Sequence, residues 1–467
     1  MPELLSIYQR LPYPFKILAA SIRGYHLRWW RYGKDTERWV EEALEREFWS
    51  EEQWSAWRQE RLSYVLHRAA TQVPYYRDYW QQQRRMGNTA SWEVLENWPI
   101  LQKETLRRSP EAFVAEDCDL RGMYCDHTSG TTGTPLKIWQ SRKTVRQWYA
   151  LFEARWRRWY GISRDDRWAI LGGQLVTSFD QVKPPFWVWN AGMRQLYCST
   201  YHINQENVGS YLLAMSKYRV KYLLGYPSAI YAMALQAARL KLTPPTLEVI
   251  ISNAEPLYSY QKQAIQDFFG CPMYDTYGMA ENVCAASQCK EGAYHLWPEV
   301  GFLEIMQDQS NHPISDGGSG RLICTGLLNA DMPLIRYNVG DRGSQDSQVK
   351  KCNCGRSLPQ LLSIEGRQDD SILTKDGRRI GRLDPIFKTD LHILEAQIIQ
   401  EEIQKFLIVI VPAPEWGEVD QDVIRERLCQ RVGDVEIRFE EVTSIPRSAN
   451  GKFKAVISKI HELDQRF

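Results

Sequence analysis

The chain has 467 residues, with 58 lysines and arginines against 57 aspartates and glutamates, so its formal net charge is only +1 at pH 7. A charge this close to zero excludes a general attraction to nucleic acid or to anionic membranes, and any basic site must be local. The length predicts two or three domains rather than one core. Ten cysteines, the lack of a signal-peptide pattern and the lack of an apolar run of about 18 residues predict a cytoplasmic protein without a membrane-spanning helix.

The first part of the chain is expected to be a largely helical scaffold. Residues 13–34 mix aromatic side chains with arginines and lysines. Such a helix can lie in a membrane interface, although it more often packs its aromatics on its own domain, so peripheral membrane contact stays open. Residues 39–80 carry apolar side chains at helical spacing and predict amphipathic helices. We assign the scaffold to residues 1–120.

The most distinctive stretch, residues 126–137, alternates hydroxyl side chains with glycines and ends in a lysine. A backbone of this kind can wrap tightly and point N–H and OH groups at a phosphate. It is not a Walker A loop, because Lys137 does not directly follow Gly133. A surface turn uses the same residue types, so the loop alone leaves both interpretations open.

Helical and strand-like segments alternate after this loop. Helices are expected at 144–160, 206–218 and 229–240, and short buried strands at 167–171, 220–224 and 247–251. The alternation predicts βαβ units and a mostly parallel sheet. Such sheets bind ligands beyond the carboxyl ends of their strands, where Tyr226, Pro227, Ser252 and Asn253 would lie.

The pattern of expected helices and strands changes twice more toward the C-terminus. Shorter strands at 302–306, 321–325 and 333–337 predict an antiparallel or barrel-like subdomain. The remaining segments predict a small α+β unit, with a hairpin around 375–378, strands at 406–411 and 435–440, and a helix at 421–432. The expected fold class is α/β, with a large N-terminal domain, 1–366, of mixed, mostly parallel sheets and a barrel-like subdomain, and a small α+β C-terminal domain, 367–467. Residues 366–370 are the candidate hinge, with Asp369 as the first choice.

Five motifs occur in an order that resembles a known superfamily. They are the loop at 128–137, Tyr-Gly-Met-Ala-Glu at 277–281, Arg-Tyr-Asn-Val-Gly-Asp at 336–341, Gly-Arg-Gln-Asp-Asp at 366–370 and Ile-Pro-Arg-Ser-Ala-Asn-Gly-Lys at 445–452. Together they resemble the signatures of adenylate-forming enzymes, which include acyl-CoA synthetases, peptide-synthetase adenylation domains and luciferases. Asn-Ala-Glu-Pro-Leu at 253–257 and Cys-Asn-Cys-Gly-Arg at 352–356 are most similar to the phenylacetate-CoA ligase branch, which includes CapK-type proteins of surface-polysaccharide clusters.

The resemblance implies a role for particular residues. Lys452 would bridge the substrate carboxylate and the α-phosphate, Glu281 would hold magnesium, Asp341 would bind both ribose hydroxyls, and Arg367 would contact the ribose or the phosphate. The residues implied to bind ATP or AMP are Thr128, Ser129, Gly130, Thr131, Thr132, Gly133, Lys137, Asn253, Ala254, Glu255, Pro256, Asp275, Tyr277, Gly278, Asp341 and Arg367. One departure is Ala280, which stands where the family usually has a threonine.

The implied activity is ATP-dependent, AMP-forming activation of a small carboxylic acid, followed by transfer to coenzyme A. Two alternatives stay open: transfer to an amine or a carrier thiol, and a nucleotide-binding relative without catalysis. Tyr226, Pro227 and Ser252 would border the acid, with Trp187, Trp189 and Tyr201 within reach, and such a pocket suits an aryl or medium-sized apolar acid. No nucleic-acid partner is expected, and the protein would be a monomer or homodimer.

The cysteines support a separate hypothesis. Cys289 and His295, followed by Cys352 and Cys354, offer three thiolates and one imidazole, which is the ligand set of a closed tetrahedral structural zinc. Similar clusters are present in some phenylacetate-CoA-ligase-like proteins, and Cys284 is a nearby substitute ligand. The alternative is four unlinked residues in a reducing environment.

Overall fold

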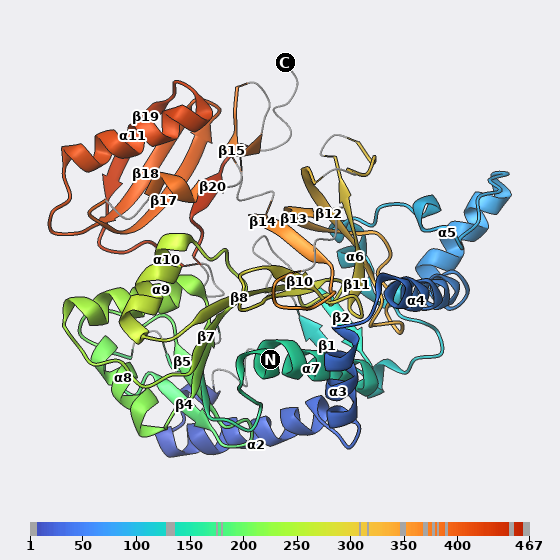
Figure 1. Cartoon of the computed structure of the whole chain (residues 1–467), viewed down its shortest axis with the longest axis horizontal. Coiled ribbons are helices and arrows are strands. Elements are labelled where there is room, and N and C mark those ends of the chain that lie inside the picture. Colours follow the sequence, from blue (N-terminus) through green and yellow to red (C-terminus); the bar gives the residue numbers. More distant parts are fainter. Residues whose placement is uncertain are drawn as a thin grey trace.

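The structure is a computed structural model, and it describes residues 7–127, 136–173, 176–178, 181–307, 310–314, 317–345, 352–367, 372–375, 379–380, 383–387, 391–447 and 453–460. Figure 1 shows a large part built round a long twisted sheet, and a smaller part, coloured orange to red, beside the helices α9 and α10. The two parts have separate hydrophobic clusters, because the cluster of residues 372–456 shares no member with those of the preceding chain. The exact boundary at residue 366 stays a prediction.

The N-terminal part is helical, as its spacing predicts. Its helices are α2 (Tyr13–Arg31), α3 (Thr36–Arg46), α4 (Glu51–Gln72), α5 (Pro74–Arg85) and α6 (Lys103–Arg108), with 3-10 turns η1 (Leu95–Asn97), η2 (Pro110–Phe113) and η3 (Leu120–Gly122). A capping box starts α4, because Ser50 and Gln53 each accept the other's backbone N–H. Tyr76, Trp80 and Trp98 form edge-to-face ring contacts beneath these helices.

The first half of the sheet has the predicted βαβ order. Its strands are β3 (Trp168–Gly172), β4 (Trp187–Asn190), β5 (Gln195–Ser199), β6 (Tyr222–Gly225), β7 (Val249–Ser252) and β8 (Met273–Gly278). Strands β5, β3, β6, β7 and β8 pair in parallel, and β4 is an antiparallel edge strand. Gly225 pairs with Ser252 and Ser252 with Asp275, so β6 and β7 end at one level, beside the middle of β8. Functional residues are expected at this edge.

Helices and one hairpin flank this sheet. They are β1 (Tyr124–His127), β2 (Lys137–Gln140), α7 (Arg142–Phe152), the π turn η4 (Glu153–Arg157), η5 (Arg158–Tyr160), α8 (Val208–Lys217), α9 (Pro227–Arg239) and α10 (Ser259–Phe269). Strands β1 and β2 pair as an antiparallel hairpin that brackets residues 128–135. The predicted helix at 144–160 is therefore α7 with its two terminal turns, whereas α10 was not predicted.

The second half of the sheet is antiparallel and occupies the place of the predicted barrel-like subdomain. Its strands are β9 (Ala285–Gln288), β10 (Tyr294–Leu296), β11 (Gly301–Met306), β12 (Ser319–Gly326), β13 (Tyr337–Gln345) and β14 (Gln360–Arg367). Strand β8 joins the halves, because it pairs in parallel with β7 and antiparallel with β9. Parallel pairing is thus confined to the first half of the sheet.

The predicted strand at 333–337 is wrong except for its last residue, because β13 begins at Tyr337. The backbone N–H of Ile335 donates to the Tyr76 hydroxyl, and that of Arg336 donates to Thr325 Oγ1. Arg336 also has a φ of 46°, which strand geometry does not allow. The backbone N–H groups of Ile335 and Arg336 therefore donate to side chains instead of to a neighbouring strand.

The small part is the predicted α+β unit. Its elements are β15 (Ile372–Leu373), β16 (Arg379–Ile380), η7 (Asp384–Phe387), β17 (Ile393–Glu402), β18 (Lys405–Pro412), α11 (Glu418–Val432), β19 (Glu436–Glu441) and β20 (Val456–Ser458). Four strands form a sheet in the order β19, β18, β17, β20. The mixed α/β fold class, with a small C-terminal unit, is confirmed. Among the described residues, no helix is long and apolar enough to cross a membrane.

Candidate functional site

The carboxyl ends of β7 and β8 are joined by side chains that the sequence singled out. Ser252 Oγ donates to Asp275 Oδ1 at 2.6 Å, and the Tyr294 hydroxyl donates to Asp275 Oδ2 at 2.7 Å. Burial raises the pKa of the Asp275 carboxyl to about 6, although both hydrogen bonds oppose this shift. Ser252 is fully buried. It therefore supports the strand ends from behind rather than offering a surface to a ligand.

The loop after β7 contacts the small part of the protein. Ala254 has a φ of 66°, and this left-handed residue turns the chain so that the next side chain faces α9. Glu255 Oε2 accepts the Ser228 N–H at 3.2 Å, in the first turn of α9. Glu255 Oε1 accepts the Phe453 N–H at 2.8 Å, and burial raises the pKa of Glu255. One carboxylate therefore links the two parts, next to the motif that ends at Lys452.

Three motifs meet where the ends of β8 and β14 approach the middle of β13. The Tyr277 hydroxyl donates to Asp341 Oδ2 at 2.7 Å, and Asp341 pairs with Arg367 across β13 and β14. Burial and the neighbouring Asp341 carboxylate raise the pKa of Tyr277 well above its usual value. A Cβ added to Gly366 would lie 3.6 Å from Pro256 Cγ, so the loop after β7 passes beside the end of β14.

Glu281 lies just beyond β8 and is only 6% exposed. Its Oε1 accepts from Lys103 Nζ at 3.2 Å and from the Tyr337 hydroxyl at 3.0 Å. Neither partner was predicted as a site residue, because the sequence pattern places Lys103 at the start of a helix and Tyr337 in a strand. The adjacent Asn282 donates to Gln140 Oε1 at 3.2 Å, and this contact ties the Glu281 turn to β2.

The remaining predicted residues are distributed as follows. Asn253 donates its N–H to the Gly225 carbonyl at the ends of β6 and β7, and Gly278 is the last residue of β8. Tyr226 and Pro227 begin α9. Lys137 opens β2, half exposed and 3.8 Å from Glu111. Outside the described residues lie Thr128, Ser129, Gly130, Thr131, Thr132, Gly133, Asp369 and Lys452.

Two aromatics expected near the acid pocket pack against other aromatic rings. The Trp187 ring contacts Tyr211 edge-on at 5.8 Å, and the Trp189 ring stacks on Tyr218 at 4.9 Å. Both belong to β4, the edge strand, and pack against the hydrophobic cluster under α8. The strand register places Trp187 level with Cys198, Leu171 and Gly225 at the end of β6, so the place of these tryptophans near the acid pocket stays a prediction.

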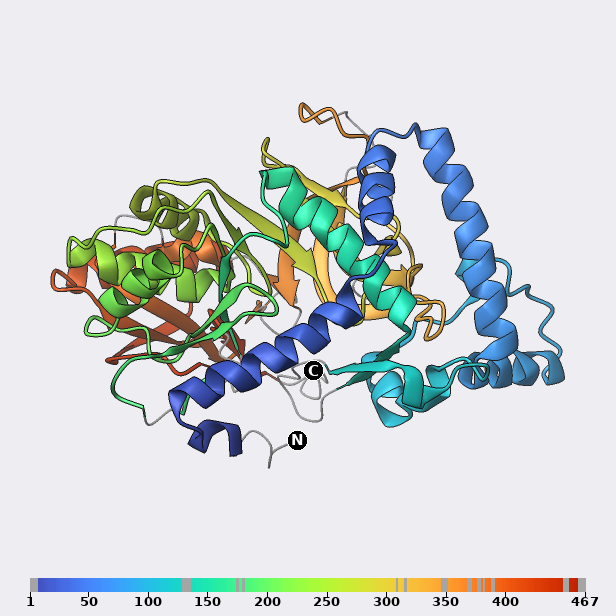
Figure 2. The ribbon, with the colours of Figure 1, turned by 90° about the horizontal axis from the view of Figure 1, so that it is seen from below.

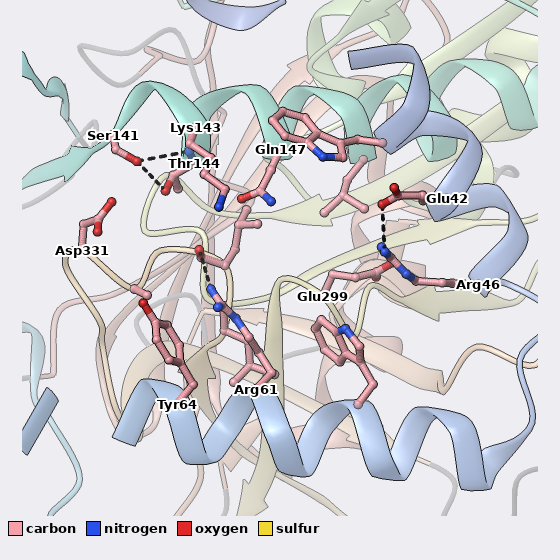
Figure 3. Close-up of a pocket in the computed structure, with 16 residues that line it drawn as sticks. Glu42, Arg46, Arg61, Tyr64, Ser141, Lys143, Thr144, Gln147, Glu299 and Asp331 are labelled. Atoms are coloured by element: carbon pink, nitrogen blue, oxygen red, sulfur yellow. Dashed lines mark hydrogen bonds and ion pairs between the residues drawn. The ribbon is translucent and has the colours of Figure 1, made fainter. Parts of the chain in front are cut away.

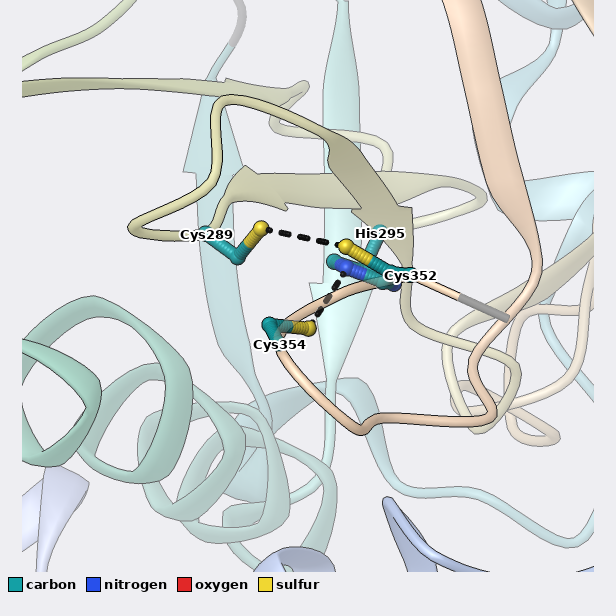
Figure 4. A group of neighbouring side chains, drawn as sticks. All are labelled: Cys289, His295, Cys352 and Cys354. Carbon is teal, nitrogen blue, oxygen red and sulfur yellow. Dashed lines mark hydrogen bonds between the residues drawn. The ribbon is translucent and has the colours of Figure 1, made fainter. Parts of the chain in front are cut away.

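The four predicted metal ligands do come together (Figure 4). The ligand atoms of Cys289, His295, Cys352 and Cys354 all lie within 4.8 Å of one another. The Cys289 and Cys352 sulfurs are 3.7 Å apart, and Cys354 Sγ is 3.3 Å from His295 Nε2. His295 Nδ1 lies 3.2 Å from the Leu358 carbonyl, which fixes the ring, and burial lowers the His295 pKa to about 4. A neutral, oriented imidazole beside three thiols is a donor set that suits zinc. Cys284 instead contacts Cys324.

A buried ion-pair network lies beside this cluster. Glu47 accepts from Arg356 Nε at 2.7 Å and from Trp159 Nε1 at 2.6 Å. Arg155 Nε is 3.5 Å from the same carboxylate, and its two terminal nitrogens donate to Glu299 at 2.8 and 2.9 Å. The network connects the end of α3 to the cysteine loop.

A separate cavity of about 320 Å³ opens among α3, α4, α7 and residues 327–331 (Figure 3). None of its lining residues is a predicted site residue. Arg46 pairs with Glu42 at 3.0 Å, and Arg61 Nε donates to the Leu327 carbonyl at 2.7 Å. Two of its cations are thus already bonded to the wall.

Comparison with known proteins identifies the family of this fold. The AMP-binding enzyme family matches residues 55–330, and the CapK C-terminal domain matches residues 372–459. Protein CapK of Staphylococcus aureus is 22% identical over 466 residues, covering 97% of this chain and 99% of that protein. A phenylacetate-coenzyme A ligase of Aromatoleum evansii is 23% identical over 335 residues, covering 70% and 73% of the two chains.

Solved structures support the same fold. A 2-hydroxyisobutyryl-CoA ligase in the postadenylation state with 2-HIB-AMP has a TM-score of 0.68 at 19% identity, covering 89% of this chain and 91% of that chain. The same ligase in the thioesterification state, with 2-HIB-AMP and CoA, has a TM-score of 0.54 at 20% identity, covering 88% and 91%.

The chain belongs to the AMP-binding enzyme family, and so to the adenylate-forming superfamily, because that family's match spans more than half of its length. The C-terminal match and the two homologues assign it to the branch that contains CapK and the phenylacetate-CoA ligases. The resemblance predicted from the five motifs is confirmed.

Proposed function

We propose that the protein is an ATP-dependent, AMP-forming ligase that converts a small carboxylic acid into an acyl-adenylate and then transfers the acyl group to coenzyme A. The observation that carries this proposal is the hydrogen bond of 2.7 Å between Tyr277 and Asp341, with Arg367 opposite Asp341 on the next strand. Three motifs from distant parts of the chain thereby meet at one edge of the sheet.

In the proposed site, Asp341 binds the ribose, since a carboxylate can accept hydrogen bonds from two neighbouring hydroxyls. Tyr277 holds one of its oxygens in place. Residues 128–137 surround the β- and γ-phosphates, and Lys452 neutralises charge at the α-phosphate as the substrate carboxylate attacks and pyrophosphate leaves. The backbone of residues 253–256 borders the nucleotide near the small domain.

Glu281 is the proposed magnesium ligand. Magnesium is usually held by one or two carboxylates together with substrate phosphates, so one buried carboxylate fits this role. Both described hydrogen bonds of Glu281 end on Oε1, and they come from Lys103 and Tyr337. When the magnesium–nucleotide complex binds, Lys103 would either share the Glu281 carboxylate with the metal or move away from it. The metal would neutralise phosphate charge during the displacement.

Coenzyme A is the proposed acceptor because phenylacetate-CoA ligases are among the homologues. Transfer to an amine or a carrier thiol is the alternative, since CapK matches the chain over nearly its whole length. The acid is proposed to lie near Tyr226 and Pro227, at the start of α9, and to be aryl or medium-sized and apolar.

Pyrophosphate exchange with a panel of carboxylic acids tests the proposal. Exchange that depends on one acid supports adenylation, and its absence with every acid would favour a nucleotide-binding relative without catalysis. Repeating the product assay without CoA, and then with amines in its place, distinguishes the two acceptors.

We expect Tyr277→Phe to raise the KM for ATP about tenfold in pyrophosphate exchange. The hydrogen bond that it removes ends on a carboxylate, and such bonds contribute about 1.5–3 kcal/mol. The matched control is Tyr160→Phe, which deletes another hydroxyl with a 2.7 Å bond, to the Gln288 carbonyl. An equal change of KM in both variants would contradict a role for Tyr277 in nucleotide binding.

The contact between Glu255 and Phe453 is proposed to hold the small domain in the arrangement used for adenylation. The TM-score is higher for the postadenylation structure of 2-hydroxyisobutyryl-CoA ligase than for its thioesterification structure. The higher score supports an arrangement of the two parts nearer to the first state. Domain rotation about residues 366–370 would break this contact before the acceptor approaches.

We expect Glu255→Ala to slow adenylation about tenfold, while thioester formation from supplied acyl-adenylate changes less than about threefold. The variant removes the acceptor of two backbone N–H groups, each of which then loses a charge-assisted bond. Glu255→Gln keeps one acceptor oxygen and should recover part of the rate. Glu60→Ala, an exposed carboxylate in α4, is the control. Equal loss in both half-reactions would refute the proposed contact.

A structural zinc at Cys289, His295, Cys352 and Cys354 is the remaining proposal. The convergence of four donors from the β9–β10 hairpin and the loop at 352–354 supports it. Zinc would pin the loop that follows Glu281 to the loop at 352–356 and so rigidify the back of the magnesium site.

A further inference from the structure

The helix α2 lies across one face of the large part and leaves one side uncovered. Figure 2 shows it as the blue helix nearest the viewer, with no other described element in front of it. Nineteen residues make a helix about 28 Å long. The helix therefore lies lengthwise along the surface of the large part.

One side of α2 is closely packed against the turn between β4 and β5. Ser21 Oγ accepts the Ala191 N–H at 3.1 Å, and Arg28 pairs with Asp165 at 2.6 Å. A Cβ added to Gly24 would lie 1.7 Å from Asn190 Oδ1, and one added to Gly192 would lie 2.3 Å from the Tyr25 backbone nitrogen. Glycine is needed at both positions for this close approach. The helix therefore cannot roll to bury its other side.

The other side carries large apolar side chains that face solvent. Phe15, Leu18, Ile22, Tyr25 and Trp29 are 57, 55, 63, 61 and 51% exposed. They are spaced alternately by three and four residues, so they form one stripe along the helix. Ile7, 60% exposed, precedes it. A contiguous exposed apolar stripe marks an interaction surface, whereas scattered exposed side chains do not.

The segment that carries the stripe has charges of one sign. Residues 7–34 contain six cations and no aspartate or glutamate: Arg10, Lys16, Arg23, Arg28, Arg31 and Lys34. Lys16 is buried and Arg28 pairs with Asp165 of a neighbouring loop, so the most exposed cations are Arg10, Arg23 and Lys34. A cation from outside the helix joins them, because the Arg142 guanidinium lies 3.2 Å above the Trp29 ring. The whole chain has a net charge of only +1, so this basic character is local.

We propose that α2 docks the protein on the surface of an anionic lipid bilayer, lying in the plane of the interface. Phe15, Leu18 and Ile22 enter the boundary between head groups and acyl chains, where Tyr25 and Trp29 also sit favourably. The exposed cations Arg10, Arg23 and Lys34 contact anionic head groups, each strengthening binding roughly fivefold. A second copy of the chain is disfavoured as the occupant, because the two stripes would bring like-charged cations together, and the nearby Asp165 is already paired with Arg28.

The test uses the full chain and sedimentation with two kinds of vesicle. One kind is phosphatidylcholine alone, and the other is phosphatidylcholine with about 30% phosphatidylglycerol. We expect binding to the anionic vesicles, weakened by salt, and at least tenfold weaker binding to the neutral ones. Phe15→Ser with Ile22→Ser should reduce binding to the anionic vesicles more than tenfold, and Arg23→Gln about fivefold.

The matched control is Leu213→Ser with Val419→Ser, two other side chains that are 73 and 78% exposed. This control should bind like the parent. All variants should keep the parent's circular dichroism and melting temperature, since every replaced side chain is at least half exposed or charged. Equal binding of the stripe variant and the parent would overturn the proposal. So would absence of binding to anionic vesicles, or a dimer in sedimentation velocity that the stripe variant dissociates.

Discussion

Lys452→Ala is expected to lower the rate of acyl-adenylate formation by about 10²–10³, while the affinity for ATP stays within a few-fold. The charge of Lys452 is needed mainly in the transition state, where negative charge shifts among crowded phosphate oxygens. Removal of one preorganised donor from such a site typically has this effect. Pyrophosphate exchange measures the rate, and equilibrium binding of ATP measures the affinity.

A neighbouring lysine provides the control for this substitution. Lys454→Ala removes the same charge two residues further along the chain. It should leave exchange nearly unchanged, which would show that the effect depends on position rather than on net charge. If Lys452→Ala exchanges pyrophosphate at the parental rate, then Lys452 has no part in adenylation.

The second large effect concerns the cysteine cluster, which we expect to carry about one zinc per purified chain. Cys352→Ser with Cys354→Ser should abolish the metal and lower the free energy of unfolding by more than about 4 kcal/mol. Metal that binds only the folded state adds its binding free energy to folding. Elemental analysis measures the zinc, and denaturant unfolding measures the stability.

Cys118→Ser is the control, because Cys118 lies outside the cluster and contacts Arg68 at 3.6 Å. It should keep the zinc and most of the stability. A parent protein free of zinc, with thiols at 352 and 354 that react rapidly with a thiol reagent, would show that the cluster holds no metal.

Much of the fold follows from local pattern. The helices α7, α8 and α9 and the strands β3, β6 and β7 follow the predicted alternation, because their periodicity and their glycine and proline boundaries agree with the tertiary structure, whereas β4 and β5 were not predicted. The error at 333–337 had a tertiary cause. Tyr76 and Thr325 take the backbone donors of Ile335 and Arg336, and no local pattern reveals partners so far away in sequence.

The candidate site was predictable to the extent that its residues lie in motifs. Tyr277, Asp341 and Arg367 were named from their motifs, and they meet in the structure. Lys103, which contacts Glu281, lies in no motif, so only the fold could reveal it. The expected place of Trp187 and Trp189 near the acid stays a prediction, because the sequence did not reveal that they lie on an antiparallel edge strand.

The network at Glu47 has a consequence for how this protein could be shortened. The AMP-binding match begins at residue 55, which would suggest a minimal catalytic fragment starting there. Such a fragment would lose Glu47, the carboxylate shared by Arg155, which is fully buried, and Arg356, which follows Cys354 by two residues. Arg155 would keep its two bonds to Glu299, but Arg356 would lose the carboxylate that accepts from its Nε at 2.7 Å, and breaking a largely buried ion pair is destabilising. The helices α2 and α3 are therefore an integral wall of the large part, and the start of the family match is the wrong place to cut it.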